Sequence, residues 1–169
     1  MMSANSVRQL NRFVLDTNVL VRATMYGAGP SGRLFDQLMF DNSKIALVCQ
    51  ESLAELRRVF GYNQIASQVS EARREMQLQL IERLSEVVEI SGLRQAVPDD
   101  PDDNVFVELA EIGRADCLVS LDRHLLALRP VGAEMAQTWQ DVEFASEAGP
   151  LPIMRPTELL KAFELGEAI

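Results

Sequence analysis

Residues 12–20 of the chain read Arg-Phe-Val-Leu-Asp-Thr-Asn-Val-Leu, a short apolar run that ends in a carboxylate. The run at 12–16 is typical of a short buried strand, and residues 18–25 predict a helix directly after it. An aspartate at the end of a buried strand has few structural roles, and burying a carboxylate is costly. Asp16 is therefore hard to explain by structure alone. The stretch therefore predicts the first strand and helix of an α/β fold, with a candidate functional side chain where they meet.

The same alternation of strand and helix continues to the end of the chain. Further short strands are predicted at 45–48, 89–90, 117–121 and 153–154. Helices are predicted at 31–40, 52–60, 67–88, 104–112, 123–128 and 156–165. This order predicts an α/β fold with a central, mainly parallel β-sheet flanked by helices in three α/β/α layers. A chain of 169 residues has the size of one typical domain, so we expect a single domain over 1–169, with 129–151 inserted before the last strand and helix.

The charge of the chain is unevenly distributed. The sequence holds 16 Lys and Arg against 25 Asp and Glu, and its formal net charge is −9. Residues 1–94 contain 11 basic and 10 acidic side chains, whereas residues 95–169 contain 5 basic and 15 acidic ones. Because the first part is nearly neutral, the net charge does not exclude nucleic acid as a partner.

Cysteine usage and hydropathy indicate the compartment. Cys49 and Cys117 lie in or beside apolar runs and form no CxxC pair, which is typical of core thiols in a reducing environment. Residues 1–11 are polar and lack the apolar stretch of a signal peptide. No run approaches the roughly 18 apolar residues of a membrane span. We therefore expect a cytoplasmic protein with no membrane contact.

Three further carboxylates stand where an α/β fold places functional side chains. Asp122 follows the fourth predicted strand, Asp103 begins a predicted helix, and Glu55 interrupts the apolar stripe of another. Ligands of such folds gather beyond the carboxyl ends of the strands, so we expect these side chains to converge with Asp16. Carboxylates held together resist ionisation, and Mg²⁺ or Mn²⁺, which prefer oxygen ligands, relieve that cost. The sequence thus predicts a metal site suited to phosphodiester chemistry, in which two ions can clamp the attacking and leaving oxygens.

Each of these carboxylates also has a plain structural interpretation, which the sequence leaves open. Asp102 or Asp103 could cap the helix that follows, and Asp122 could cap the next short one. Glu55 could pair with a neighbouring arginine on the surface. The only histidine of the sequence, His124, lies in a short predicted helix and is interpreted as an incidental surface residue.

Four stretches of the chain, in order, resemble the motifs of PIN-domain nucleases, the fold of VapC-like toxins. They are LDTNVL at 15–20, ESLAELR at 51–57, DDPDDNVF at 99–106 and ADCLVSLD at 115–122. The stretch at 153–160 resembles the closing strand and helix of the same family. Each motif is short, but their order along nearly the whole chain makes the resemblance specific.

The resemblance implies a role for each residue at a motif position. It implies four catalytic acids that hold Mg²⁺ or Mn²⁺ and position the attacking water: Asp16, Glu55, Asp103 and Asp122. Asp116 is a further candidate metal ligand, ranked below these four because it lies at the entrance of its strand. It also implies polar side chains that support the acids: Thr17, Asn18 and Ser120.

By the same resemblance, we expect a metal-dependent endoribonuclease that acts as the toxin of a toxin–antitoxin pair. Its expected partners are an RNA substrate, an antitoxin protein and a second copy of the chain. Phosphate contacts are normally made by Lys or Arg, and the candidates for RNA contact are Arg22, Arg33, Arg57, Arg58 and Arg123. The alternative is a PIN-like nucleic-acid-binding or scaffold module with little or no cleavage activity, against which the intact set of four acids argues.

Other phosphate-handling classes fit the sequence poorly. Residues 27–32 match the pattern GxGxxG, but a dinucleotide site needs the glycines directly after the first strand, and about ten residues intervene here. Asn18 stands where a haloacid-dehalogenase-type phosphatase needs a second aspartate. The chain has no GxxxxGK[ST] loop, which excludes a P-loop nucleotide hydrolase.

Overall fold

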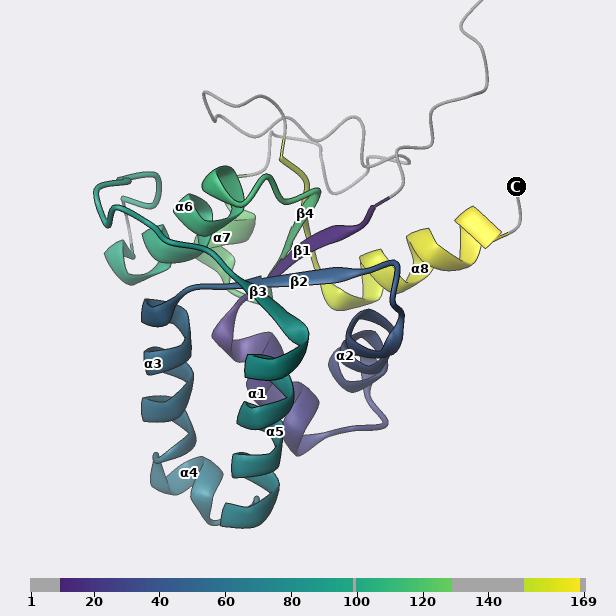
Figure 1. The fold of residues 1–169 in the computed structure, drawn as a ribbon, viewed down its shortest axis with the longest axis vertical. Helices are drawn as coiled ribbons and strands as arrows, with labels where there is room; N and C mark the ends of the chain where they lie inside the picture. Colours follow the sequence, from purple (N-terminus) through teal and green to yellow (C-terminus); the bar gives the residue numbers. More distant parts are fainter. Residues whose placement is uncertain (1–9, 99, 129–150, 168–169) are drawn as a thin grey trace, which may run out of the picture.

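The computed structural model describes residues 10–98, 100–128 and 151–167 (Figure 1). The predicted insertion at 129–151 lies outside the described residues except for its last residue, Leu151.

Parallel strands form one sheet through the centre of the described chain (Figure 1). The strands are β1 (Arg12–Leu15), β2 (Ile45–Val48), β3 (Ser85–Val87), β4 (Cys117–Val119) and β5 (Ile153–Met154). Their order is β3-β2-β1-β4-β5, so the first strand of the sequence lies in the middle. Because every neighbouring pair is parallel, the carboxyl ends of these strands meet at one edge of the sheet.

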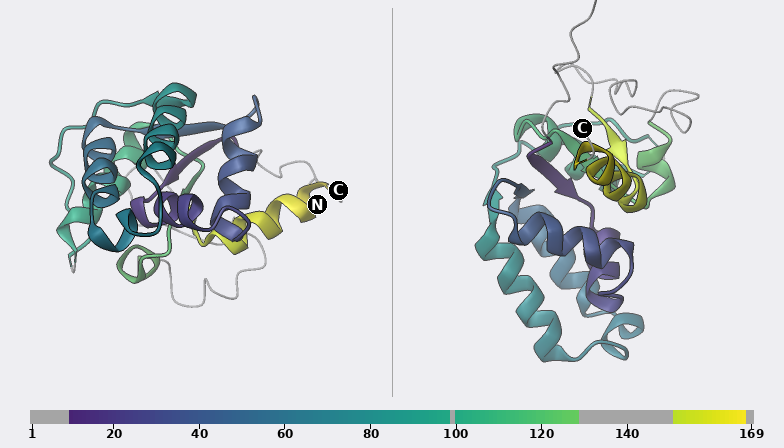
Figure 2. Two further views of the ribbon diagram at one scale, coloured as in Figure 1. Left: turned by 90° about the horizontal axis from the view of Figure 1, so that it is seen from below. Right: turned by 90° about the vertical axis from the view of Figure 1, so that its right-hand side faces the viewer.

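Helices cover both faces of this sheet, as the alternation in the sequence predicts. One face carries α1 (Thr17–Met25), α2 (Pro30–Phe40), α3 (Gln50–Phe60), α4 (Asn63–Ala66), α5 (Glu71–Leu84) and α8 (Pro156–Glu167). The other face carries α6 (Asn104–Ile112) and α7 (Arg123–Leu126). Figures 1 and 2 show α3, α4 and α5 extending together away from the sheet. The prediction of a three-layer α/β/α fold with a mainly parallel sheet is therefore confirmed.

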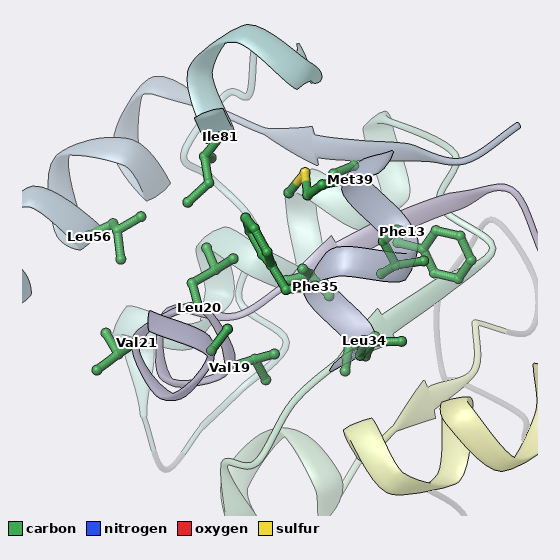
Figure 3. Packing of buried hydrophobic residues seen from close by; sticks show 14 of the residues in the cluster. Phe13, Val19, Leu20, Val21, Leu34, Phe35, Met39, Leu56 and Ile81 are labelled. Carbon is green, nitrogen blue, oxygen red and sulfur yellow. The ribbon is translucent and has the colours of Figure 1, made fainter. Parts of the chain in front are cut away.

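The core consists of two apolar clusters, one on each face of the sheet. Successive strand side chains point to opposite faces, so Phe13 and Leu15 of β1 join the first cluster and Val14 joins the second. In Figure 3, the ring of Phe35 of α2 points toward Leu20 of α1 and Ile81 of α5, and all three belong to the first cluster. A sheet buried on both faces explains why the strands read as continuous apolar runs instead of alternating ones.

The predictions for residues 63–90 are wrong in part. The helix expected at 67–88 is shorter and lies at Glu71–Leu84 (α5), and a separate short helix, α4, precedes it at Asn63–Ala66. The third strand lies at Ser85–Val87 and not at 89–90. Within α5, Leu78 and Ile81 are buried, whereas Met76 is 59% exposed. The helix ends early because residues 85–87 pair with Ala46, Leu47 and Val48 of β2, a long-range contact that local periodicity does not report.

The glycine-rich stretch at 27–32 serves packing. A Cβ atom built on Gly32 would lie 2.6 Å from Gly27 Cα, and backbone atoms cannot move aside as a flexible side chain can. We expect Gly32→Ala to lower the free energy of unfolding by about 3 kcal/mol, the upper range for overpacking. A Cβ on Gly27 would meet Arg73 Nη2 at 3.5 Å and the Ala23 carbonyl oxygen at 4.0 Å, both ordinary contacts, so the matched Gly27→Ala variant is expected to lose less than about 1 kcal/mol. Urea unfolding of the two variants measures the difference, and equal midpoints would contradict this account.

Candidate metal centre

The pairing of β1 with β4 brings two of the predicted site residues, Asp16 and Ser120, side by side. Leu15 of β1 pairs with Val119 of β4, so Asp16 and Ser120 follow the paired strands at the same edge of the sheet. The backbone N–H of Asp16 donates to the Val119 carbonyl oxygen over 3.0 Å, which extends the pairing by one step. Residues separated by more than a hundred positions in sequence thus become neighbours.

Asp16 is 3% exposed and fully hydrogen-bonded. Its Oδ1 accepts from the Val19 backbone N–H at 3.0 Å, and its Oδ2 accepts from the Ser120 hydroxyl. The same hydroxyl oxygen accepts from the Asp122 backbone N–H at 2.9 Å. Burial, together with the nearby charge of Asp122, raises the pKa of Asp16 to about 6, against the lowering effect of the hydrogen bonds from Ser120 and Val19. Ser120 therefore links the two strand-end acids.

Glu55 reaches the edge of the site from α3. Its Oε2 accepts from the Thr17 hydroxyl at 2.5 Å, and Thr17 is the residue after Asp16. Its Oε1 lies 3.9 Å from Arg58 Nη2, the surface pairing that the sequence leaves open. The Thr17 hydroxyl holds Glu55 beside the first turn of α1.

A second group of side chains gathers at the start of α6 and α7. Asp100, Asp103, Asp122 and His124 each offer a ligand atom, and these atoms all lie within 4.8 Å of one another. Asp100 precedes a short 3-10 turn, Pro101–Asp103, and Asp103 ends that turn directly before α6. Neither Asp16 nor Glu55 belongs to this tightest group, although the charge of Asp16 acts on Asp103.

Asp103 has the most strongly perturbed carboxyl group in the described chain. Burial, followed by the charges of Asp122 and Asp100, raises its pKa to about 8. Its Oδ2 atom is sealed from solvent and has no hydrogen-bond partner among the described residues. An unpartnered carboxylate oxygen that faces other carboxylates is costly, and a divalent cation with oxygen ligands removes that cost. The residues present therefore fit Mg²⁺ or Mn²⁺.

The capping interpretation is correct for Asp122 and wrong for Asp103, and Asp16 is a helix cap that the sequence did not predict. Asp16 caps α1, and Asp122 caps α7 by accepting from the His124 backbone N–H at 2.7 Å. Asp103 precedes α6 but makes no side-chain capping hydrogen bond within the described structure. Asp122 can cap α7 with Oδ1 and still offer its second oxygen to a cation, whereas both oxygens of Asp16 already accept hydrogen bonds.

Asp116 does not join the group. Its Oδ2 accepts from the backbone N–H groups of Asn11 at 2.9 Å and Arg12 at 3.0 Å. These contacts lie at the start of β1 and β4, the opposite edge of the sheet from Asp16. Asp116 thus stabilises the amino end of the central strand, which corrects its candidacy as a metal ligand.

His124 does join the group, contrary to its interpretation as an incidental surface residue. Its side chain is 25% exposed, and its Nδ1 lies 3.5 Å from both Asp100 Oδ2 and Asp122 Oδ1. The sequence does hold one indication that His124 belongs to the site. His124 lies two residues after Asp122, and the first turn of a short helix places it beside the capping side chain of Asp122. Asn18, by contrast, is exposed on α1.

The candidate RNA-contacting arginines are all exposed, but they differ in their surroundings. Arg58 lies near Glu55, and Arg123 directly follows Asp122. The other three have contacts that their position in sequence does not reveal: Arg22 stacks over the Tyr26 ring at 5.6 Å, Arg33 lies 4.0 Å from Glu164, and Arg57 pairs with Glu82.

Comparisons with known proteins agree with this architecture. The family model described as PIN domain matches residues 12–124. The crystal structure of PAE2754 from Pyrobaculum aerophilum is similar to 98% of this chain over 99% of its own, with 16% sequence identity and a TM-score of 0.57. The crystal structure of VapBC2 from Rickettsia felis, bound to a DNA fragment from its promoter, aligns with 69% of this chain and 92% of its own, at 16% identity and a TM-score of 0.46. No curated protein sequence matches the chain. None of the helices in the described ranges is long and apolar enough to cross a membrane.

Proposed function

The chain belongs to the PIN-domain family, a family of nucleases, and from that premise we propose that it is an endoribonuclease that hydrolyses RNA phosphodiester bonds with Mg²⁺ or Mn²⁺. The observation that carries the proposal is the Asp103 carboxylate, whose buried Oδ2 has no hydrogen-bond partner in the described chain and faces other acids. A site of this kind favours cation binding over any structural role of the same carboxylates.

Each side chain of the site would have its own role in such a hydrolysis. Asp103 and Asp122 would hold the cation, and Asp16 would complete its coordination from the central strand. Ser120 orients Asp16 through its hydroxyl, and Thr17 orients Glu55 in the same way. When bound, a divalent cation lowers the pKa of a water ligand and offsets charge on the phosphate. Glu55, beside Thr17 at the edge of the cluster, would receive the proton of the attacking water or direct that water.

The proposal is tested by RNA cleavage with purified protein. We expect cleavage of structured RNA in Mn²⁺ or Mg²⁺, its loss in chelator, and at least about a hundredfold loss in Asp122→Asn, because a cation ligand contributes several kcal/mol. The matched control is Asp116→Asn, the same substitution at the other end of β4, which is expected to keep full activity. Equal cleavage by all three proteins, or by none, would remove the nuclease assignment and favour a binding or scaffold module.

We further propose that the protein is the toxin of a toxin–antitoxin pair in the cytoplasm, that it forms a homodimer, and that an antitoxin protein binds it. The support is the resemblance of the motif at 99–106 to the toxin branch of the family. Induced expression would then arrest growth, and Asp122→Asn would relieve the arrest. Arrest that persists in this variant would contradict the toxin role without affecting the cleavage assay.

A further inference from the structure

His124 occupies a position in the acid cluster that the four family acids do not explain. It is the second residue of α7, and Asp122 fixes its backbone by capping that helix. The Nδ1 atom is sealed from solvent and has no hydrogen-bond partner in the described part of the chain. Nevertheless it lies 3.5 Å from two carboxylate oxygens, one of Asp100 and one of Asp122.

The 3.5 Å distances from His124 Nδ1 to the two carboxylate oxygens fit ligands of one shared cation better than they fit a direct ion pair. A charge-assisted N–H···O bond between an imidazole and a carboxylate closes to about 2.7–2.9 Å. Ligand atoms around one octahedral ion at about 2.1 Å lie about 3.0 Å apart when adjacent and about 4.2 Å apart when opposite. One ring nitrogen of His124 and one carboxylate oxygen from each of Asp100, Asp103 and Asp122 all lie within 4.8 Å of one another, so a small side-chain adjustment closes them around a cation.

We propose that His124 donates Nδ1 as a ligand to the divalent cation at Asp103 and Asp122, and that this nitrogen makes the site prefer Mn²⁺ over Mg²⁺. The inference rests on the metal site of the proposed function. An imidazole nitrogen suits first-row transition ions, whereas Mg²⁺ strongly prefers oxygen ligands and retains water. A site made of carboxylates alone would discriminate less between the two ions.

The sequence makes a direct spectroscopic test feasible, because His124 is its only histidine. Tag-free, full-length protein is prepared with ¹⁴N-histidine or ¹⁵N-histidine, loaded with Mn²⁺ alone, and measured by pulsed electron paramagnetic resonance. We expect a coupling from a directly bound imidazole nitrogen that changes with the isotope. His124→Gln is expected to lose this coupling and to bind Mn²⁺ about tenfold or more weakly, while Mg²⁺ affinity changes much less. The control Asp102→Asn, an exposed neighbour outside the cluster, is expected to keep the coupling and both affinities.

The outcomes separate this inference from the proposed function. Bound Mn²⁺ without nitrogen coupling would overturn the assignment of His124 and leave a metal-dependent nuclease intact. Failure of the wild type to bind Mn²⁺ would overturn both. Nitrogen coupling in a protein that cleaves no RNA would support the metal ligand and contradict the nuclease.

Discussion

Asp103→Asn is expected to abolish RNA cleavage and to leave the metal-free protein at least as stable as the wild type. Asp103 is partly buried beside Asp122 and Asp100, and its Oδ2 atom lacks a hydrogen-bond partner among the described residues. Removing its charge relieves repulsion in the folded state, since the amide is neutral at every pH. Removing a cation ligand also costs several kcal/mol of transition-state stabilisation, which corresponds to about a thousandfold loss in rate.

The raised pKa of Asp103 adds a pH dependence to the same comparison. The folded carboxyl titrates with a pKa of about 8, against an ordinary value of 3.8 in the unfolded chain. Between these values the folded state binds the extra proton, so the metal-free wild type loses stability as pH rises from about 4 to about 8. Thermal unfolding in chelator should show this decline, and Asp103→Asn should show less of it. Parallel curves for the two proteins would contradict the assigned pKa, and lost cleavage together with a collapsed fold would contradict the functional role.

Asp16→Asn is expected to reduce cleavage by about a thousandfold with little effect on the fold. The substitution keeps an oxygen that can accept from the Val19 N–H and cap α1, but it removes the charge from a side chain only 3% exposed. The comparison variant Asp16→Ala loses the cap as well, and it should lower the free energy of unfolding by a further 0.5–2 kcal/mol, roughly the range for loss of an N-cap. Cleavage kinetics and urea unfolding of both variants separate charge from capping. An Asp16→Asn protein that cleaves RNA at the wild-type rate would rule out a catalytic role for Asp16.

Local patterns were sufficient for most of the fold. The apolar runs at 45–48 and 153–154 and the helix at 104–112 match the observed elements, because each is bounded by turn residues and has a clear period. Residues 63–90 were misassigned because α5 has a weak apolar face and β3 depends on pairing with β2. A three-residue strand with two exposed residues leaves almost no local signal.

Only part of the candidate site could be predicted from the sequence. The motifs alone were enough to select the four acids, because a motif match depends only on residue types and on their order in the sequence. The sequence also ranked Asp116 below Asp122, because Asp116 lies at the entrance of the same strand, but only the pairing with β1 shows what Asp116 contacts there. The sequence did not reveal the role of His124 for a related reason: that role depends on Asp100, which lies before the start of α6 in a separate part of the sequence.

Residue chemistry and spacing alone were enough to specify short buried strands that alternate with helices, and a carboxylate at the end of the first strand. They could not specify which carboxylates meet. The parallel pairing of β1 with β4 brings Asp16 next to Ser120 and Asp122, and the turn before α6 adds Asp103. Burial and mutual repulsion then raise the pKa values of Asp16 and Asp103, an effect that arises only when the charges share a low-dielectric space. That assembly turns separate acidic residues into a site that fits a cation.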